Sequence, residues 1–304
     1  MKIVFMGTPE IAVPSLIRLS KEHEVAAVFC QPDKPVGRKH VLTAPPVKKA
    51  AAELGIPVYQ PRKMRDGTVR GILEEINPDV CAVIAYGRLL PDDVLAVPKY
   101  GFINAHGSLL PKYRGAAPIQ YALINGDSTT GVTIMKIGSD MDAGDIILQR
   151  ETEILPEDDA YSMFDKLGKM SAEMFSEVLS DIEGSLASAR PQDPGKATFA
   201  PPLTTEQSVF SFRDPAWEIF GKVRGMCMNP VARTTAFSKK LLVLRAGLSE
   251  QSGRPGEVLG LDPLTVACGE GAVVLLSVKP EGKSEMTGTA WASGHRLKKG
   301  MVIE

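Results

Sequence analysis

The stretch that decides the fold is Asp79-Val80-Cys81-Ala82-Val83-Ile84-Ala85, a short apolar run with Asn77-Pro78 before it and Gly87 after it. A run of this length between turn residues is typical of a strand that is buried on both faces. Similar runs occur at residues 2–6, 25–30, 101–104 and 131–137. These runs predict a mostly parallel β-sheet that is covered on both faces.

Helix-length stretches separate the apolar runs. One continues to Leu19, with Pro14 in its first turn, and others occupy residues 47–54 and 69–76. Apolar residues spaced by three and four predict one long amphipathic helix over 161–182. Short strands that alternate with helices are typical of an α/β fold, so we expect a Rossmann-like, doubly wound domain over residues 1–188.

The pattern of the sequence changes after residue 188. Residues 189–203 contain four prolines and one glycine and predict a linker. Beyond it, a helix is expected at 215–224, and short strands are expected at 241–244, 265–267 and 272–278. We therefore expect residues 204–304 to form a smaller, mainly β domain that resembles a partly open, OB-like barrel.

The composition excludes several classes of protein. The chain has 304 residues, with 35 Lys and Arg against 36 Asp and Glu, which excludes a wholly basic nucleic-acid coat and an acidic disordered chain. No stretch approaches the roughly 18 apolar residues of a membrane span. The four cysteines are far apart and lack metal-site spacing, which favours reduced thiols in a cytoplasmic protein.

The densest group of polar residues begins where the predicted strand at 101–104 ends. Asn104 and His106 are two residues apart, so in an extended chain their side chains point to the same side. An amide can donate a hydrogen bond to a developing oxyanion, and a neutral imidazole can accept a proton near pH 7. This pair predicts a catalytic site, although a lone histidine at a strand end is also compatible with a purely structural role.

An acidic loop follows the predicted strand at 131–137. It contains Asp140, Asp142 and Asp145 among glycines, without the spacing of a calcium-binding loop and without His or Cys. The pattern therefore does not predict a metal site. One of these carboxylates could hold and polarise His106, and the alternative is an ordinary solvated turn.

The most concentrated positive charge lies at residues 34–49, which carry five Lys and Arg and no acid. Its proline and glycine content predicts a loop rather than a helix. Contact with phosphate and a simple solvated loop are equally compatible with this pattern.

Several nucleotide and hydrolase motifs are missing. The turn after the first strand, Gly7-Thr8-Pro9, has neither the Gly-x-Gly-x-x-Gly pattern nor a P-loop, and no Gly-x-Ser-x-Gly segment occurs in the chain. The sequence thus argues against a nucleotide-driven enzyme and a serine hydrolase.

Two segments together resemble the folate-dependent formyltransferase family. They are Asn104 with residues 106–115, which begin His-Gly-Ser-Leu-Leu-Pro, and residues 141–145 (Met-Asp-Ala-Gly-Asp). The resemblance covers essentially the whole chain and is greatest to the members that act on tRNA, which the segments 5–16, 31–38 (Gln-Pro-Asp-Lys-Pro-Val-Gly-Arg), 197–201 and 223–225 also resemble. It differs at Val36 and Lys39, where the family loop commonly has Ala and Gly.

The resemblance implies a reaction and a catalytic trio. The formyl group of 10-formyltetrahydrofolate, the co-substrate, would pass to the α-amino group of methionine on initiator methionyl-tRNA during translation initiation. Asn104 and His106 would stabilise the oxyanion or accept the amine proton, and Asp142 would increase the basicity of His106 or position a water. No metal is implied.

The same resemblance implies two binding surfaces. The folate pocket would be bordered by Tyr86, Gly87, Arg88 and Leu89 and by Ser108, Leu109, Leu110 and Pro111. The tRNA would contact Lys34, Arg38 and Lys39, with further phosphate contacts from Lys239, Lys240, Arg245, Arg296, Lys298 and Lys299. We expect a monomer that does not bind membranes.

The sequence is also compatible with other functions. The trio would also serve formyl transfer to glycinamide ribonucleotide or to a nucleotide-linked amino sugar, and it would serve a hydrolase that releases formate. A non-catalytic module that binds tRNA or folate is a further alternative, although it would not need Asn104, His106 and Asp142 together. A second domain of roughly 100 residues favours tRNA.

Overall fold

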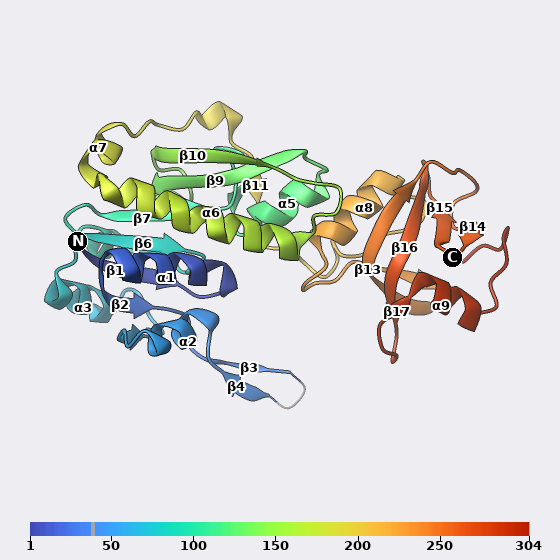
Figure 1. The fold of residues 1–304 in the computed structure, drawn as a ribbon, viewed down its shortest axis with the longest axis horizontal. Coiled ribbons are helices and arrows are strands. Elements are labelled where there is room, and N and C mark those ends of the chain that lie inside the picture. Colours follow the sequence, from blue (N-terminus) through green and yellow to red (C-terminus); the bar gives the residue numbers. More distant parts are fainter. Residues whose placement is uncertain (38–39, 304) are drawn as a thin grey trace. The chain divides into compact units, whose positions relative to one another are not determined.

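The computed structural model describes residues 1–37 and 40–303 (Figure 1). The chain divides into two compact units. The first comprises Met1–Pro118, Thr130–Thr152 and Phe164–Ala200, and the second comprises Ile119–Thr129, Glu153–Met163 and Pro201–Glu304. Each unit has its own hydrophobic core.

The first unit is built on a seven-stranded sheet with the order β10-β9-β7-β6-β1-β2-β5. The strands are β1 (Lys2–Gly7), β2 (Glu24–Phe29), β5 (Val58–Tyr59), β6 (Val80–Ile84), β7 (Phe102–His106), β9 (Thr129–Lys136) and β10 (Ile146–Glu153). The pairings from β5 through β7 are parallel, whereas β9 runs antiparallel to β7. The prediction of a parallel-dominated α/β sheet is confirmed.

The central strands are buried on both faces, as their apolar sequences require. Successive side chains of β1 point to opposite faces, so Val4 and Met6 face one way while Ile3 and Phe5 face the other. All four are fully buried. Val4 and Met6 belong to the same core as residues of α3 (Thr68–Ile76) and α4 (Asp92–Leu95).

The remaining helices up to residue 196 are η1 (Glu10–Ala12), α1 (Val13–Glu22), α2 (Pro46–Glu53), α5 (Pro118–Ile124), α6 (Ala160–Ser180), α7 (Ile182–Ala187) and η2 (Pro194–Lys196). Among them, α1, α2 and α6 are close to the predicted ones, and η1, α5, α7 and η2 were not predicted. The predicted helix over 161–182 ends two residues early. Asp181 interrupts it because its side chain accepts a hydrogen bond from the Gly184 backbone N–H and caps α7 instead.

The prediction of a loop throughout residues 34–49 is wrong in part. Its first half is a hairpin of β3 (Lys34–Val36) and β4 (Val41–Thr43), and its last four residues belong to α2. Proline is compatible with the first turn of a helix because that turn does not need its N–H groups. Pro46 therefore begins α2 rather than prolonging the loop.

The second unit contains an antiparallel sheet with the order β12-β13-β16-β15-β14, and β17 pairs with β16. These strands are β12 (Arg233–Ala236), β13 (Lys239–Ser249), β14 (Val258–Leu261), β15 (Leu264–Ala267), β16 (Ala272–Pro280) and β17 (Met286–Thr287). The helices α8 (Ala216–Gly225) and α9 (Gly288–Gly294) contribute Ile219 and Trp291 to its core. A mainly β second region was predicted and is confirmed.

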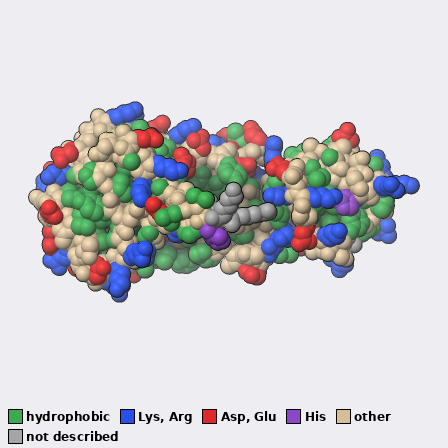
Figure 2. All heavy atoms as spheres, turned by 90° about the horizontal axis from the view of Figure 1, so that it is seen from below, with side chains coloured by type: hydrophobic (Ala, Val, Ile, Leu, Met, Phe, Trp, Pro, Cys, Tyr) green, Lys and Arg blue, Asp and Glu red, His purple; other side chains and the backbone are tan. Residues whose placement is uncertain are grey.

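The surface carries charges of both signs. Figure 2 shows acidic and basic side chains interspersed over one face, in line with a net charge of −1. Among the helices of the described chain, none combines the length and the apolar character that crossing a membrane requires.

Candidate active site

The candidate site begins at the carboxyl end of β7, where the strand lies between β6 and β9. Asn104 pairs with Val83 of β6 and His106 pairs with Thr133 of β9. The Asn104 side chain is partly buried and makes no hydrogen bond to any residue that the structure describes. Its amide is therefore available to a ligand.

His106 is 6% exposed and has a defined tautomer when neutral. Its Nε2 lies 2.9 Å from the carbonyl oxygen of Tyr113. Because a carbonyl oxygen can only accept, Nε2 carries the proton and Nδ1 carries the lone pair. Nδ1 lies 3.7 Å from Oδ2 of Asp142. A proton that arrives at Nδ1 would create an imidazolium facing a carboxylate, which is the arrangement of a general base.

Asp142 occupies the loop between β9 and β10 in an unusual backbone conformation. Its φ is +51°, a region that residues with side chains rarely adopt. Oδ2 accepts a hydrogen bond of 2.8 Å from the Gly115 backbone N–H. Gly144 lets the loop approach β9, because a Cβ at that position would lie 1.9 Å from the Lys136 carbonyl oxygen. The predicted approach of Asp142 to His106 is thus present.

Gln192 also holds this loop, although no sequence pattern singles it out. Its side chain is 9% exposed. Nε2 donates hydrogen bonds of 2.8 Å to the carbonyl oxygens of Asp142 and Gly144, and Oε1 accepts from the Arg114 guanidinium at 3.0 and 2.7 Å. Nothing in the sequence around Gln192 predicts these contacts. They require residues 190–200 to return to residues 114–115, as they do where β11 (Phe199–Ala200) pairs with β8 (Arg114–Gly115).

The segment 108–111 is held from beneath by two polar residues of the sheet. The Thr133 hydroxyl donates to the Ser108 carbonyl oxygen at 2.7 Å and accepts from the Leu110 N–H at 3.1 Å. Gln149 donates to the Leu110 carbonyl oxygen at 2.9 Å. A threonine within the mostly apolar run 131–137 was a signal that the sequence analysis missed.

The predicted folate-binding residues 108–111 therefore differ in how they can contact a ligand. The side chains of Ser108 and Leu110 are buried, and the Ser108 hydroxyl donates to the Lys112 carbonyl oxygen at 2.6 Å. Leu109 and Pro111 are partly exposed.

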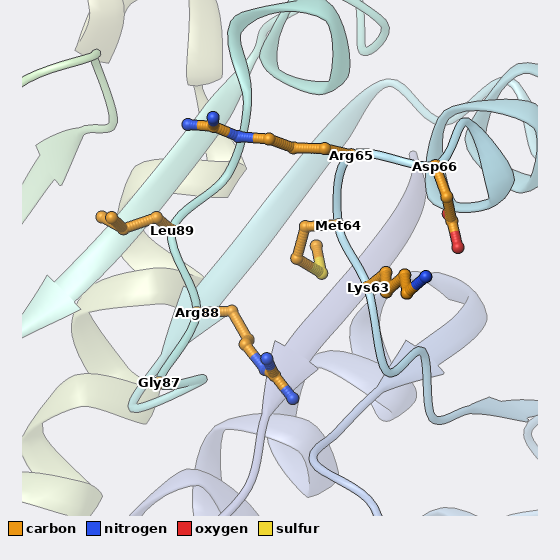
Figure 3. Close-up of a pocket in the computed structure, with 7 residues that line it drawn as sticks. All are labelled: Lys63, Met64, Arg65, Asp66, Gly87, Arg88 and Leu89. Carbon is orange, nitrogen blue, oxygen red and sulfur yellow. The ribbon is translucent and has the colours of Figure 1, made fainter.

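A pocket of about 680 Å³ opens beside the loop that follows β6. Figure 3 shows its lining, and the Arg65 side chain extends from its own segment towards the segment of Leu89. Met64 and Leu89 offer apolar contacts. The lining residues are Lys63, Met64, Arg65, Asp66, Gly87, Arg88 and Leu89. Three of the four predicted residues 86–89 thus line this pocket, whereas none of residues 108–111 belongs to its described lining.

Tyr86 is placed differently from its neighbours. Its side chain lies in the core, where burial raises the pKa of its phenol to about 12. Its carbonyl oxygen accepts hydrogen bonds from Thr8 and Gln31, and Arg88 donates to Gln31 at 3.2 Å. These contacts hold the loop over the pocket, so Tyr86 supports the loop rather than facing a ligand through its ring.

The predicted tRNA-binding segment is only partly described. Lys34 is exposed at the start of β3, whereas Arg38 and Lys39 lie outside the described residues. Lys48 is not a free cation, because it lies 2.9 Å from Asp33. The hydrogen bonds from Lys48 and Gln60 hold the pKa of the Asp33 carboxyl below its usual value.

The six basic residues of the second unit that were expected to contact phosphate are exposed. None of Lys239, Lys240, Arg245, Arg296, Lys298 and Lys299 forms an ion pair with a residue in the described part of the chain. Within the same part of the chain, no three His, Cys, Asp or Glu side chains gather as metal ligands would.

Comparison with known proteins identifies the family. The formyl transferase model matches residues 1–179, and the model of the formyl transferase C-terminal domain matches residues 202–296. The chain belongs to the formyl transferase family. The resemblance inferred from residues 104–111 and 141–145 is thereby confirmed.

Within this family, the chain is similar to curated relatives over nearly their whole length. The methionyl-tRNA formyltransferase of Listeria monocytogenes serotype 4a (strain HCC23) is 46% identical over 297 residues, which cover 96% of this chain and 95% of that protein. The enzyme of the same name from Pelotomaculum thermopropionicum is 41% identical and covers 100% and 98%.

Several solved structures share the fold. The methionyl-tRNA formyltransferase of Clostridium thermocellum matches with a TM-score of 0.57 at 18% identity, covering 82% of this chain and 94% of that one. WlaRD, a sugar 3N-formyl transferase, matches with a TM-score of 0.68 at 17% identity and coverages of 93% and 99%. HypX from Aquifex aeolicus matches at 0.66 and 20% identity over 98% of this chain, which spans about half of HypX.

Proposed function

We propose that this formyl transferase moves the formyl group of 10-formyltetrahydrofolate to the α-amino group of methionine on initiator methionyl-tRNA. The curated relatives that carry this name match 95–98% of their own length at 41–46% identity. The observation that carries the chemistry is the free Nδ1 of His106, 3.7 Å from the Asp142 carboxylate.

The proposed catalytic roles follow from the hydrogen bonds of each side chain. The methionine amine attacks the formyl carbon as a neutral group, because an ammonium has no lone pair. His106 accepts the amine proton at Nδ1, and Asp142 stabilises the resulting imidazolium. The Asn104 amide donates to the formyl oxygen as it becomes negative.

The second half of the reaction must return that proton. The new bond joins the amine nitrogen to the formyl carbon, and the bond from that carbon to N10 of the folate breaks. N10 leaves as a neutral amine if the imidazolium of His106 donates the same proton to it. His106 thus serves first as base and then as acid, and no net proton leaves the site.

The pocket chemistry fits a folate. Met64 and Leu89 can pack against a planar ring, the Gly87 backbone can hydrogen-bond its polar edge, and Lys63, Arg65 and Arg88 match carboxylates. We therefore propose Gly87, Arg88 and Leu89 as direct folate contacts, with Leu109 and Pro111 beside the reacting group and Tyr86, Ser108 and Leu110 shaping the backbone. Family members use 10-formyltetrahydrofolate as their formyl donor.

The tRNA contacts and the remaining expectations are proposals as well. We assign Lys34, Arg38 and Lys39 to tRNA binding and keep the domain limits 1–188, 189–203 and 204–304. We also propose a cytoplasmic monomer. Arg38→Ala should weaken the use of tRNA and leave folate binding intact, and an unchanged response to tRNA would move recognition away from this segment.

The test of the function compares three acceptors. Formyl transfer is measured with methionine-charged initiator tRNA, the same tRNA uncharged, and methionine-charged elongator tRNA. Product with the charged initiator alone is expected. Folate consumption without product would instead move the acceptor to water or another amine. His106→Ala should abolish nearly all turnover while folate still binds, and near-normal turnover of this variant would contradict the assigned site.

A further inference from the structure

Three aromatic rings meet in the second unit, where the β12–β13 turn contacts the end of α9. The rings of Phe237 and His295 are nearly parallel, at 13°, with their centroids 5.7 Å apart. The His295 ring lies 4.7 Å from that of Trp291, whose carbonyl oxygen is 2.9 Å from His295 Nδ1. The contacts fix the orientation of the imidazole.

The stack is buried at one end and open at the other. Trp291 is 3% exposed and belongs to the core, whereas Phe237 is 39% exposed and His295 is also exposed. Because one face of the Phe237 ring packs against its neighbours, its exposed area lies on the opposite face and edge. An apolar ring surface is thus presented to solvent on a rigid support.

The geometry of the turn does not explain why residue 237 is a phenylalanine. Ala236 pairs with Lys239, so Phe237 and Ser238 form a two-residue hairpin turn with φ values of +50° and +59°. Turns of this type favour Asn-Gly, and a bulky side chain is disfavoured at a positive φ. An unfavourable backbone conformation that carries an exposed ring indicates a role beyond the turn.

The ring contact also brings two groups of cations together. Lys239 and Lys240 follow Phe237 along the chain, and Arg296 and Lys298 follow His295. All four are exposed, and none makes an ion pair within the described residues. Each ring of the stack is therefore followed along the chain by unpaired positive charge, which matches a polyanion rather than an apolar protein surface.

We propose that Phe237 and His295 form a stacking platform for an unstacked base of the bound tRNA, with the flanking lysines and arginine on neighbouring phosphates. Exposed aromatic rings beside cations bind single-stranded nucleic acid because every base has a π-face. The platform rests on the proposed function, which supplies the RNA. It adds contact with a tRNA base to a surface for which only contacts with tRNA phosphates were expected.

The first experiment measures the affinity of the full chain for fluorescein-labelled initiator tRNA by anisotropy. Phe237→Leu keeps the apolar bulk without the aromatic face and should weaken tRNA binding by about 5- to 100-fold. Phe237→Trp keeps an aromatic face and should bind the tRNA about as tightly as the wild type. Leu248→Ala, which shortens another exposed apolar side chain of the same unit, should bind like the wild type. Equal affinity of Phe237→Leu and the wild type would overturn the platform.

Salt dependence separates stacking from charge. Phe237→Leu should lower the affinity at every salt concentration without changing the slope of log K against log salt, whereas Lys298→Ala should reduce that slope by about 1. The double variant Phe237→Asn, Ser238→Gly keeps the turn in its favoured sequence and should still lose affinity. Full affinity in this folded variant would assign Phe237 to packing alone.

The outcomes distinguish the platform from the function on which it rests. If the wild type transfers formyl to initiator tRNA and the Phe237 variants bind that tRNA normally, the platform is wrong and the proposed function stands. If the wild type neither binds nor formylates the tRNA, both are wrong.

Discussion

Gln192→Glu tests how the Asp142 loop is held in place. The replacement has nearly the same shape, and one oxygen can still accept from Arg114 at the distances of 3.0 and 2.7 Å. The other oxygen would face the carbonyl oxygens of Asp142 and Gly144, to which the amide now donates. The variant thus keeps one set of contacts and removes the other.

The magnitude follows from the two lost hydrogen bonds. Each neutral hydrogen bond contributes about 0.5–1.5 kcal/mol net, so the loop loses about 1–3 kcal/mol of its ordering. Asp142 has a φ of +51°, and without these bonds its backbone can relax to a commoner conformation and move the carboxylate from Nδ1 of His106. If this loss of free energy lowers the population of the active loop conformation by the corresponding factor, kcat falls about 5- to 150-fold.

The assay is steady-state formyl transfer at saturating 10-formyltetrahydrofolate, with thermal unfolding of the same samples. We expect kcat to fall while the KM for the charged tRNA changes less than about twofold, because Gln192 positions the loop that carries a catalytic group. Gln251→Glu, which adds the same charge at an exposed position, is the matched control. A kcat within twofold of the wild type in a folded Gln192→Glu protein would refute the reasoning.

Three further predictions follow from single positions. Asn104→Ala should lower kcat by about 10²–10³-fold with little change in stability, because the amide has no hydrogen-bond partner among the described residues; turnover and urea unfolding of the pure variant check this. Gly131→Ala should lower the free energy of unfolding by about 1–3 kcal/mol, since the added Cβ would lie 2.1 Å from the Arg150 carbonyl oxygen and 2.6 Å from Leu109; an unchanged urea midpoint would contradict the close approach. Cys30 and Cys268 should resist alkylation in the native protein at pH 8, because burial raises the pKa of both thiols to about 11 and leaves about 0.1% as thiolate; mass spectrometry should find modification only after denaturation.

The local sequence determined most of the fold. The apolar run of β6 and the similar runs of β1, β2 and β7 specified buried strands, because an α/β sheet covered on both faces admits few polar side chains. The long helix α6 followed from residues three and four apart. The errors lie at Asp181, which ends α6 early, and in residues 34–49, where a hairpin and the start of α2 at Pro46 replace the expected loop.

The sequence alone could place only those site residues that lie together on one predicted strand. Asn104 and His106 are two apart on one strand, so the sequence alone placed them side by side. Asp142 was one of three acidic candidates in its loop, and the residues by themselves did not select it. The family resemblance did so.

The sequence by itself thus determined the buried central strands, the alternation of buried faces and the residue types available for acyl transfer, because these depend on neighbours a few positions apart. Only the tertiary structure decided which groups support them. Gln192 reaches Asp142 across 50 positions, and Phe237 meets His295 across 58. Such contacts depend on how whole strands and helices pack, and a pattern within one segment carries no information about a partner so far along the chain.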